Sequence, residues 1–288
     1  MTAVALGTAD GVAFVGLMRR YVINYTNAHD QTQTQFIMEP DYALRMGDHF
    51  VTGRDGAYAA ATRKQLKQFP GLGLTVHEIC TSGERLVMRF SEHGASARHG
   101  GATAVWGGIG LYRWNGRRLT ANNVEQDYVS RARQLETGQP LSVESPAIAP
   151  WDTVAAGTDP GAVNIVTRWL NNSGVDRTPA VLLDDQWAGV PPQKQLEQES
   201  LTINDIFSCG AVVAFHATQH GRVIGEPDSP IAAHAGQKAQ LHIAGIVHVR
   251  NGVVAHGRVI RNRLELRRSL ERNAAANILG PGVAGRRA

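Results

Sequence analysis

The stretch LTVHEICTSGERLVMRFSEHG, residues 74–94, recurs as LTINDIFSCGAVVAFHATQHG at residues 201–221. The two segments align without a gap at an offset of 127, and six of their 21 positions are identical. In each segment a turn (Ser82-Gly83 or Cys209-Gly210) separates two runs in which apolar and polar residues alternate. This pattern predicts a β-hairpin in each copy. A period this long indicates a duplicated domain rather than a solenoid.

The similarity continues on both sides of the hairpins. Downstream, WGGIGLYRWNG (106–116) aligns with HIAGIVHVRNG (242–252) at an offset of 136. Upstream, residues 25–42 resemble residues 170–187 more loosely. We therefore predict two domains of about 130 residues each. Their expected bounds are 1–136 and 161–272, with a Pro-containing linker at 137–160 and a flexible tail at 273–288.

Each copy is expected to place its helices before its strands. In the first copy, helical spacing or turn residues predict helices over 10–27, 31–38 and 56–68, with a short strand at 42–46. Period-two alternation then predicts strands over 74–80, 85–93, 103–114 and 119–128. Helices followed by an antiparallel meander predict the α+β class. A long curved sheet around such helices would form a cone that encloses a cavity.

Composition excludes several classes of protein. The 288 residues are 43% hydrophobic and carry a formal net charge of +4. No apolar run is long enough to cross a membrane, and no basic segment precedes the apolar N-terminus, so no membrane partner or signal peptide is expected. Two cysteines without CxxC spacing indicate reduced thiols and a cytoplasmic location.

The positive charge is concentrated near the C-terminus. Residues 258–288 contain eight Arg and two Glu, which give this segment a charge of +6. Such a segment can contact phosphates, but no interleaved aromatic residues or recognised binding motif accompany it. Nucleic acid is therefore not the expected partner, and the alternative is a solvated strand or helix.

No motif for a cofactor or a catalytic metal is present. The chain lacks a GxGxxG in a βαβ setting, a P-loop, an HExxH and a GxSxG elbow. His216 and His242 fall on neighbouring predicted strands, but no acid or cysteine stands at ligand spacing. We expect neither cofactor nor metal.

The order of elements, with PGLGLTVHEICTSGERLVMRFSEHG (70–94) and IGLYRWNGRRLTANNVEQDY (109–128), resembles the SnoaL-like branch of the nuclear transport factor 2-like superfamily. The resemblance covers most of residues 10–133 and, more weakly, 160–272. It implies two cone domains, each with three helices packed in a curved, mainly antiparallel sheet. It also implies an intramolecular pseudo-dimer of the two copies, and leaves a further homodimer open. The superfamily includes polyketide cyclases, ketosteroid isomerases, limonene-type epoxide hydrolases, dehydratases and non-catalytic binding domains.

The resemblance also implies a catalytic carboxylate on the last strand of the cone, and the matching residue is Asp127. Strand alternation places Asn123, Glu125 and Asp127 on one face. If that face lines the cavity, two carboxylates lie about 6–7 Å apart. An apolar pocket would then raise at least one carboxyl pKa toward neutrality. The alternative is a solvent-facing edge with ordinary ionised side chains.

Arg89 and His93 are further candidates for the catalytic site. Arg89 falls near the position of the arginine in limonene-type epoxide hydrolases, although Ser91 stands where their acid is expected and Glu92 points to the opposite face. His93 can share a proton with Asp127, or it can serve as a strand-end residue, a role that His220 would repeat.

Four residues are expected to contact the substrate. Trp106 and Tyr112 share one face of their strand, and Tyr25 and Asn123 offer hydrogen-bonding groups. For Trp106 and Tyr25, structural packing is the alternative role. Arg89 or Asn123 would stabilise an enolate or another oxyanion.

The second copy is expected to be degenerate, because Asn262 replaces Asp127 and Ile260 replaces Glu125. The chain as a whole is thus predicted to be a cofactor-independent acid/base enzyme of the cyclase, isomerase or dehydratase type. Its substrate would be a largely apolar small molecule, such as a polyketide- or terpenoid-like carbonyl compound. The alternatives are an epoxide hydrolase of the limonene or polyether type and a non-catalytic small-molecule-binding or scaffold protein.

Overall fold

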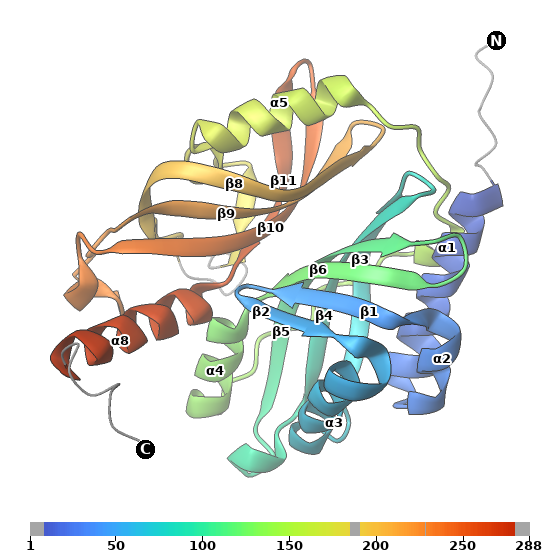
Figure 1. Ribbon diagram of the computed structural model, residues 1–288, viewed down its shortest axis with the longest axis horizontal. Helices are drawn as coiled ribbons and strands as arrows, with labels where there is room; N and C mark the ends of the chain where they lie inside the picture. The colour runs from blue at the N-terminus through green and yellow to red at the C-terminus, as the bar shows by residue number, and fades with distance from the viewer. Residues whose placement is uncertain (1–8, 185–190, 228, 280–288) are drawn as a thin grey trace, which may run out of the picture.

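The computed structural model describes residues 9–184, 191–227 and 229–279, and its strands form two curved sheets (Figure 1). The first sheet has the strand order β2-β1-β6-β5-β4-β3, and the second has the order β7-β11-β10-β9-β8. Strand pairs are antiparallel except for β1 with β6 and β7 with β11. Helices and mainly antiparallel strands occur in succession in both halves, so the predicted α+β class is confirmed.

The strands have the following bounds. Those of the first sheet are β1 (Met38–Met46), β2 (His49–Thr52), β3 (Gly73–Thr81), β4 (Arg85–Ala95), β5 (Thr103–Trp114) and β6 (Leu119–Gln126). Those of the second sheet are β7 (Val181–Leu183), β8 (Leu196–Cys209), β9 (Val212–Val223), β10 (Lys238–Arg250) and β11 (Val253–Arg261).

Along the chain, helices come both before and after the strands of each sheet. The first half contains α1 (Ala9–Arg20), η1 (Tyr21–Asn27), η2 (Gln31–Gln33), α2 (Thr34–Ile37), η3 (Gly53–Tyr58), α3 (Ala59–Gln68), η4 (Ala97–His99) and α4 (Tyr128–Thr137). The linker and the second half contain η5 (Pro150–Asp152), α5 (Pro160–Asn171), α6 (Gly174–Arg177), η6 (Ala232–His234) and α8 (Arg263–Leu279). None of the described helices is both long and apolar enough to cross a membrane.

The duplication is visible in the hydrogen-bond ladders. A bulge interrupts the β3–β4 pairing between Val76 and Glu78, and the β8–β9 pairing is interrupted 127 residues later, between Ile203 and Asp205. The bulged residue makes the equivalent contact in each copy. His77 Nε2 lies 2.9 Å from Ser91 Oγ, and Asn204 Nδ2 donates to Thr218 Oγ1 over 2.9 Å.

Downstream of the hairpins the predicted alignment is wrong by one residue. Gly110 pairs with Met88 in the first sheet and Gly245 pairs with Phe215 in the second, which sets the offset at 135 instead of 136. The predicted equivalence of Trp106 with His242 therefore does not hold. A one-residue slip moves a side chain to the other face of a sheet, and His242 indeed faces the opposite way to Trp106.

The two sheets pack against each other through an apolar contact between the halves. It contains Val87, Ile109 and Leu111 from the first sheet and Phe207, Cys209, Ala214, Ala244, Ile246 and Ile260 from the second. The helices α1, α2 and α3 lie on the far side of the first sheet, and α5 lies on the far side of the second (Figure 1). The linker runs along β3, where Ala147 and Ala156 each donate a backbone hydrogen bond to it.

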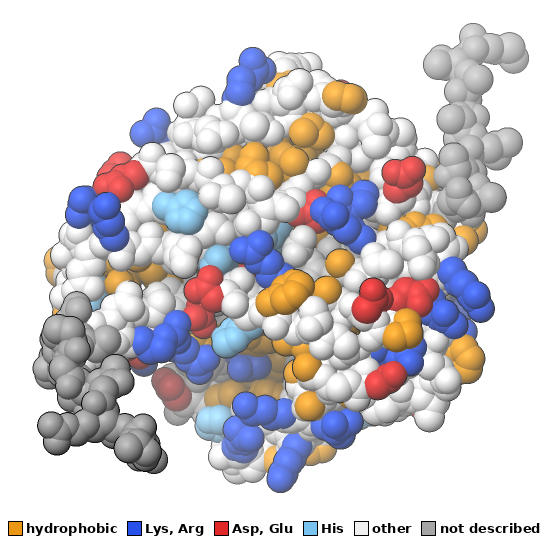
Figure 2. Space-filling view, in the orientation of Figure 1, with side chains coloured by type: hydrophobic (Ala, Val, Ile, Leu, Met, Phe, Trp, Pro, Cys, Tyr) orange, Lys and Arg blue, Asp and Glu red, His pale blue; other side chains and the backbone are white. Residues whose placement is uncertain are grey.

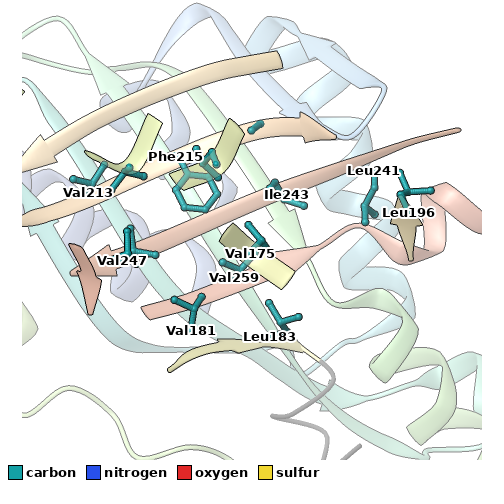
Figure 3. Packing of buried hydrophobic residues seen from close by; sticks show 14 of the residues in the cluster. Val175, Val181, Leu183, Leu196, Val213, Phe215, Leu241, Ile243, Val247 and Val259 are labelled. Atoms are coloured by element: carbon teal, nitrogen blue, oxygen red, sulfur yellow. The ribbon is translucent and has the colours of Figure 1, made fainter. Parts of the chain in front are cut away.

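The interiors of the two halves differ. In the second half, α5 and aliphatic side chains of the sheet fill the concave face around Phe215 (Figure 3). Val213, Ile243, Val247 and Val259 surround that ring within one continuous cluster. In the first half, the equivalent space contains a cavity.

Several boundaries differ from the prediction, and β1, for example, begins at Met38 where a strand was expected from residue 42. The last strand of the first half ends at Gln126, because Asp127 caps α4 by accepting a hydrogen bond from Ser130 N, and Gly138 ends that helix in the left-handed conformation. At the C-terminus, α8 continues to Leu279 where a flexible tail was expected from residue 273, since Ala274, Ala275 and Ala276 favour helix. Residues 280–288 of that predicted tail lie outside the described residues.

Candidate functional site

A cavity of about 420 Å³ lies on the concave face of the first sheet. Its volume is typical of small-molecule sites, for which about 300–1,000 Å³ is usual. Its inner walls are formed by apolar and aromatic side chains, namely Tyr21, Leu44, Met46, Val51, Tyr58, Phe69, Leu74, Phe90, Tyr112, Val124 and Tyr128. Its polar lining includes Gln65, Glu92, Asn122, Gln126 and Arg131.

Strand alternation determines which residues reach this cavity. In β4, Phe90 and Glu92 point into it, and in β6, Asn122, Val124 and Gln126 do so. Glycines of β5 give these side chains room: a Cβ at Gly108 would lie 2.5 Å from the Phe90 ring. The glycine face therefore accommodates aromatic walls of the cavity.

Glu92 is the acid in the cavity wall. Its residue is only 7% exposed. Its Oε2 accepts hydrogen bonds from Gln65 Nε2 (2.8 Å) and Trp106 Nε1 (3.1 Å). Burial raises the pKa of the Glu92 carboxyl to about 7, although the nearby Arg131 charge and these hydrogen bonds act in the opposite direction. Near neutral pH this group is therefore equally able to accept and to donate a proton.

Several tyrosine hydroxyls surround the same cavity. Tyr21 and Tyr58 lie at the ends of the wide helical turns η1 and η3, and Tyr112 comes from β5. Burial raises the pKa of each of these three phenols well above its usual value. They therefore stay protonated and can donate hydrogen bonds to a bound oxygen.

The second half contributes to the mouth of this cavity. Asn262, Leu264, Glu265 and Arg268, from the start of α8, line it together with Lys64 of α3 and Arg131 of α4. Figure 2 shows basic side chains gathered around the hollow where these helices approach one another. The site is thus built on the first copy but completed by the second.

Asp127 lies outside the cavity. It follows β6, is 1% exposed, and accepts hydrogen bonds from Ser130 N and from Arg263 Nη2 (3.0 Å each). Burial and the neighbouring Asp184 raise the pKa of Asp127, while Arg263 acts in the opposite direction. Asn262 occupies the equivalent position and caps α8 through Glu265 N, so this strand end has a capping role in both copies.

Glu125 and Asn123 also face the second half instead of the cavity. Glu125, which is 0% exposed, accepts hydrogen bonds from Gly47 N (2.8 Å) and Asn262 Nδ2 (2.7 Å) and lies 2.8 Å from His216 Nε2. Asn123 Nδ2 donates to Asp205 Oδ2. The expectation that this face lines the cavity is not met, because it is the face on which the second sheet packs.

Arg89 and His93 lie on that same outer face. Arg89 donates to both carboxylate oxygens of Glu144 in the linker, over 2.7 and 3.0 Å. His93 is half-buried, with Nε2 3.3 Å from Thr75 Oγ1, and burial lowers its pKa. His220 makes the equivalent contact with Thr202 (3.0 Å), in a half whose interior is filled. The repeated contact supports a structural role for His93.

The three aromatic candidates have different surroundings. Tyr112 lines the cavity, as expected of a substrate-binding residue. Trp106 is fully buried behind the wall, where its Nε1 donates to Glu92 and to Gln126 Oε1 (3.0 Å), so it positions the acid. Tyr25 is buried near the cavity and its hydroxyl lies 3.1 Å from Thr62 Oγ1.

The sequence pattern of β4 already marks Glu92 as unusual, although Glu92 was not among the predicted site residues. On β4 the face with Leu86, Met88 and Phe90 is otherwise entirely apolar, and Glu92 is its one charged member. A charge on an apolar face indicates a buried, functional group more strongly than a charge on a mixed face. The sequence held no comparable signal for the α8 residues, which are distant in the chain.

No group of three or more His, Cys, Asp or Glu side chains within the described residues is arranged to hold a metal ion. His216 and His242 stack with ring centroids 6.5 Å apart and bond to Glu125 and Asp48, respectively.

Solved structures similar to this chain include one described as a SnoaL-like polyketide cyclase from Jannaschia sp. CCS1, at 14% identity and a TM-score of 0.40, covering 47% of this chain and 96% of that one. Another is a nuclear transport factor 2-like protein of unknown function from Burkholderia pseudomallei. It is 17% identical, has a TM-score of 0.39, and the match covers 43% of this chain and 97% of that one. A third is an LEH-like epoxide hydrolase from M. tuberculosis. It is 13% identical, has a TM-score of 0.38, and the match covers 46% of this chain and 90% of that one. Each match spans about half of this chain. No protein-family model matches the chain, and no curated protein matches it in sequence.

Proposed function

We propose that this chain is a cofactor-independent proton-transfer enzyme that acts on a largely apolar carbonyl compound in the cavity of its first half. The reaction class is cyclisation, isomerisation or dehydration. One observation carries the proposal: Glu92, with a pKa of about 7, lies in the wall of a mainly apolar cavity. A general acid or base works best when its pKa is close to the working pH.

The surrounding residues suit this chemistry. Ionised Glu92 takes a proton from the carbon next to the carbonyl, and the protonated carboxyl returns it at another position. The phenols of Tyr21, Tyr58 and Tyr112 are donors for the oxyanion that develops on the substrate. Trp106 and Gln65 fix the orientation of Glu92 by their hydrogen bonds to its Oε2.

Deuterium exchange tests the proposal without requiring the natural substrate. The protein is incubated in D₂O with a panel of polyketide-like β-dicarbonyl compounds and terpenoid ketones, and mass spectrometry follows deuterium uptake. Exchange should be accelerated by the unaltered protein and fall at least about 100-fold in Glu92→Gln, as removal of a general base does. Glu84→Gln, at an exposed turn position, is the matched control and should exchange at the original rate.

Three results would contradict the proposal. Uptake that is equal in the Glu92→Gln variant and the unaltered protein would exclude Glu92 as the base. Glu92-dependent incorporation of ¹⁸O from labelled water into a panel of epoxides, without deuterium exchange, would replace proton transfer by epoxide opening. Tight ligand binding that is unchanged in Glu92→Gln, with neither reaction, would support a binding protein.

A further inference from the structure

Three basic side chains converge on the mouth of the cavity from different helices. Lys64 comes from α3, Arg131 from α4 and Arg268 from α8, so both halves of the chain contribute. Lys64 and Arg268 are exposed, and Arg131 is half-buried. Among the described residues, no acidic side chain forms an ion pair with any of the three. The mouth therefore holds three basic side chains that form no ion pair with the described residues.

The acid at the mouth, Glu265, is already paired with other residues. Glu265 lines the mouth, but its Oε1 accepts a hydrogen bond from Arg272 (2.8 Å) and its Oε2 lies 3.6 Å from His49 Nε2. Glu92 lies deeper, and burial favours its neutral form. Within the described residues neither carboxyl forms an ion pair with Arg131 or Arg268, although ionised Glu92 interacts with the Arg131 charge.

Arg131 is held in place by aromatic rings instead of an anion. Its guanidinium carbon lies 4.0 Å from the centroid of the Tyr128 ring and 5.1 Å from that of Trp106. Burial lowers the pKa of Arg131 and the charge of Arg268 acts in the same direction, whereas Tyr128 and Glu92 act in the opposite direction. Two cations kept close together on an apolar support form a favourable place for an anion.

We propose that this mouth is an anion-binding subsite, and that the substrate is an apolar acid whose carboxylate is held by Arg131 and Arg268, with Lys64 at the outer edge. The proposal rests on the proposed function, and it specifies the substrate class. Arg131 packs on the same indole that donates to Glu92. The reacting carbon therefore lies only a few bonds from the carboxylate.

A pair of fluorescent probes isolates the contribution of the anion. 8-Anilinonaphthalene-1-sulfonate and N-phenyl-1-naphthylamine share one aromatic skeleton, but only the first carries a charge. Removing the cation in Arg131→Gln or Arg268→Gln should weaken the sulfonate probe about tenfold, the usual worth of a charge-assisted contact, and leave the neutral probe within about twofold. Octanoate should displace the sulfonate probe, whereas inorganic phosphate should not.

Controls separate charge from packing. Arg133→Gln, on the same helix but exposed and away from the cavity, should leave both probes unaffected. Arg131→Lys should restore much of the sulfonate affinity, and thermal unfolding should show that each variant is folded. Equal loss of both probes, or no loss of the sulfonate probe, would overturn the subsite. Displacement by inorganic phosphate but not octanoate would also overturn it.

The Glu92→Gln variant distinguishes this proposal from the previous one. At about pH 5, where Glu92 is protonated in the unaltered protein, the variant should bind the sulfonate probe as tightly, because Glu92 is not part of the anion subsite. Neutralising Arg131 with the probe should also raise the pKa of Glu92 above 7, since the Arg131 charge holds that value down. If the probe binds at the mouth without moving the Glu92 titration, the anion does not contact Arg131 and the proposal fails.

Discussion

Burial of Glu92 connects its pKa with the stability of the fold. The carboxyl has a pKa of about 7 in the folded chain and an ordinary value of 4.5. Between these pH values the folded state holds a proton that the unfolded state has released. The stabilisation from this proton is therefore complete below about pH 4.5 and is lost as the pH rises through 7.

Replacing Glu92 by Gln should remove this pH dependence. Between pH 4 and pH 8 the unaltered protein should lose about 3 kcal/mol of unfolding free energy relative to the variant. This figure follows because a tenfold change in an ionisation constant corresponds to about 1.4 kcal/mol. Urea denaturation at a series of pH values measures the difference. A difference that does not change with pH would mean that Glu92 titrates like a solvated carboxyl group.

Trp106 should influence the acid through its indole N–H, which donates to Glu92 as well as to Gln126. Its Nε1 donates to Glu92 Oε2 and so favours the ionised form. In Trp106→Phe the pKa of Glu92 should rise further, by about one, because the loss of a donor disfavours the charge. The pH profile of deuterium exchange reports this change in pKa. A profile that keeps its midpoint while the rate falls would indicate that Trp106 acts only through packing.

Most strands of the first sheet could be predicted from the sequence, but most of the residues that line the cavity could not. Repeat, turn and alternation placed β3, β4 and β5 within one or two residues of their observed bounds. Alternation also divided β6 correctly into two faces, but both faces carry polar residues. The face of β6 that lines the cavity is decided by the second sheet, which covers the other face. The contacts between them join residues more than 75 positions apart in sequence, such as Glu125 and His216. The apolar face of β4 was the better guide.

Asp127, the residue that follows β6, caps helix α4 in this structure. Asp127→Ala should destabilise the protein by about 1–3 kcal/mol, because it removes the cap of α4 and a partner of Arg263. Asp127→Asn keeps a capping oxygen and should cost less. Chemical denaturation measures both, and the Glu92 pKa should not change in either. Loss of exchange activity in a stable Asp127→Asn variant would instead indicate catalysis by this residue.

In the molecule as a whole, the interiors of the two copies differ. The second copy has filled its own interior around Phe215 and lends Asn262, Glu265 and Arg268 to the mouth of the first. In the described part of its basic C-terminal segment, Arg263 forms ion pairs with Asp127 and Asp184. The sequence indicated a degenerate copy, but it did not indicate that this copy completes the site.

The buried contact of Glu125 should make the two halves unfold together. Glu125→Ala removes the partner of Gly47 N, His216 and Asn262 at once, and should cost about 3–5 kcal/mol. Urea denaturation and amide hydrogen exchange measure this loss, and protection should fall in both sheets. Glu136→Ala, on the exposed face of α4, is the control. Loss of protection in the first sheet alone would contradict a shared interface.

A titration of the Glu92 carboxyl itself tests directly whether this group can act as acid and base near neutral pH. Carbon-13 NMR of protein labelled at the glutamate side-chain carboxyl, with Glu92→Gln used to assign the resonance, follows its ionisation. We predict a midpoint near pH 7, moving upward when a hydrophobic acid binds. A midpoint near pH 4.5 would mean a solvated, fully ionised carboxylate at neutral pH. In that case this cavity would lack its acid/base group.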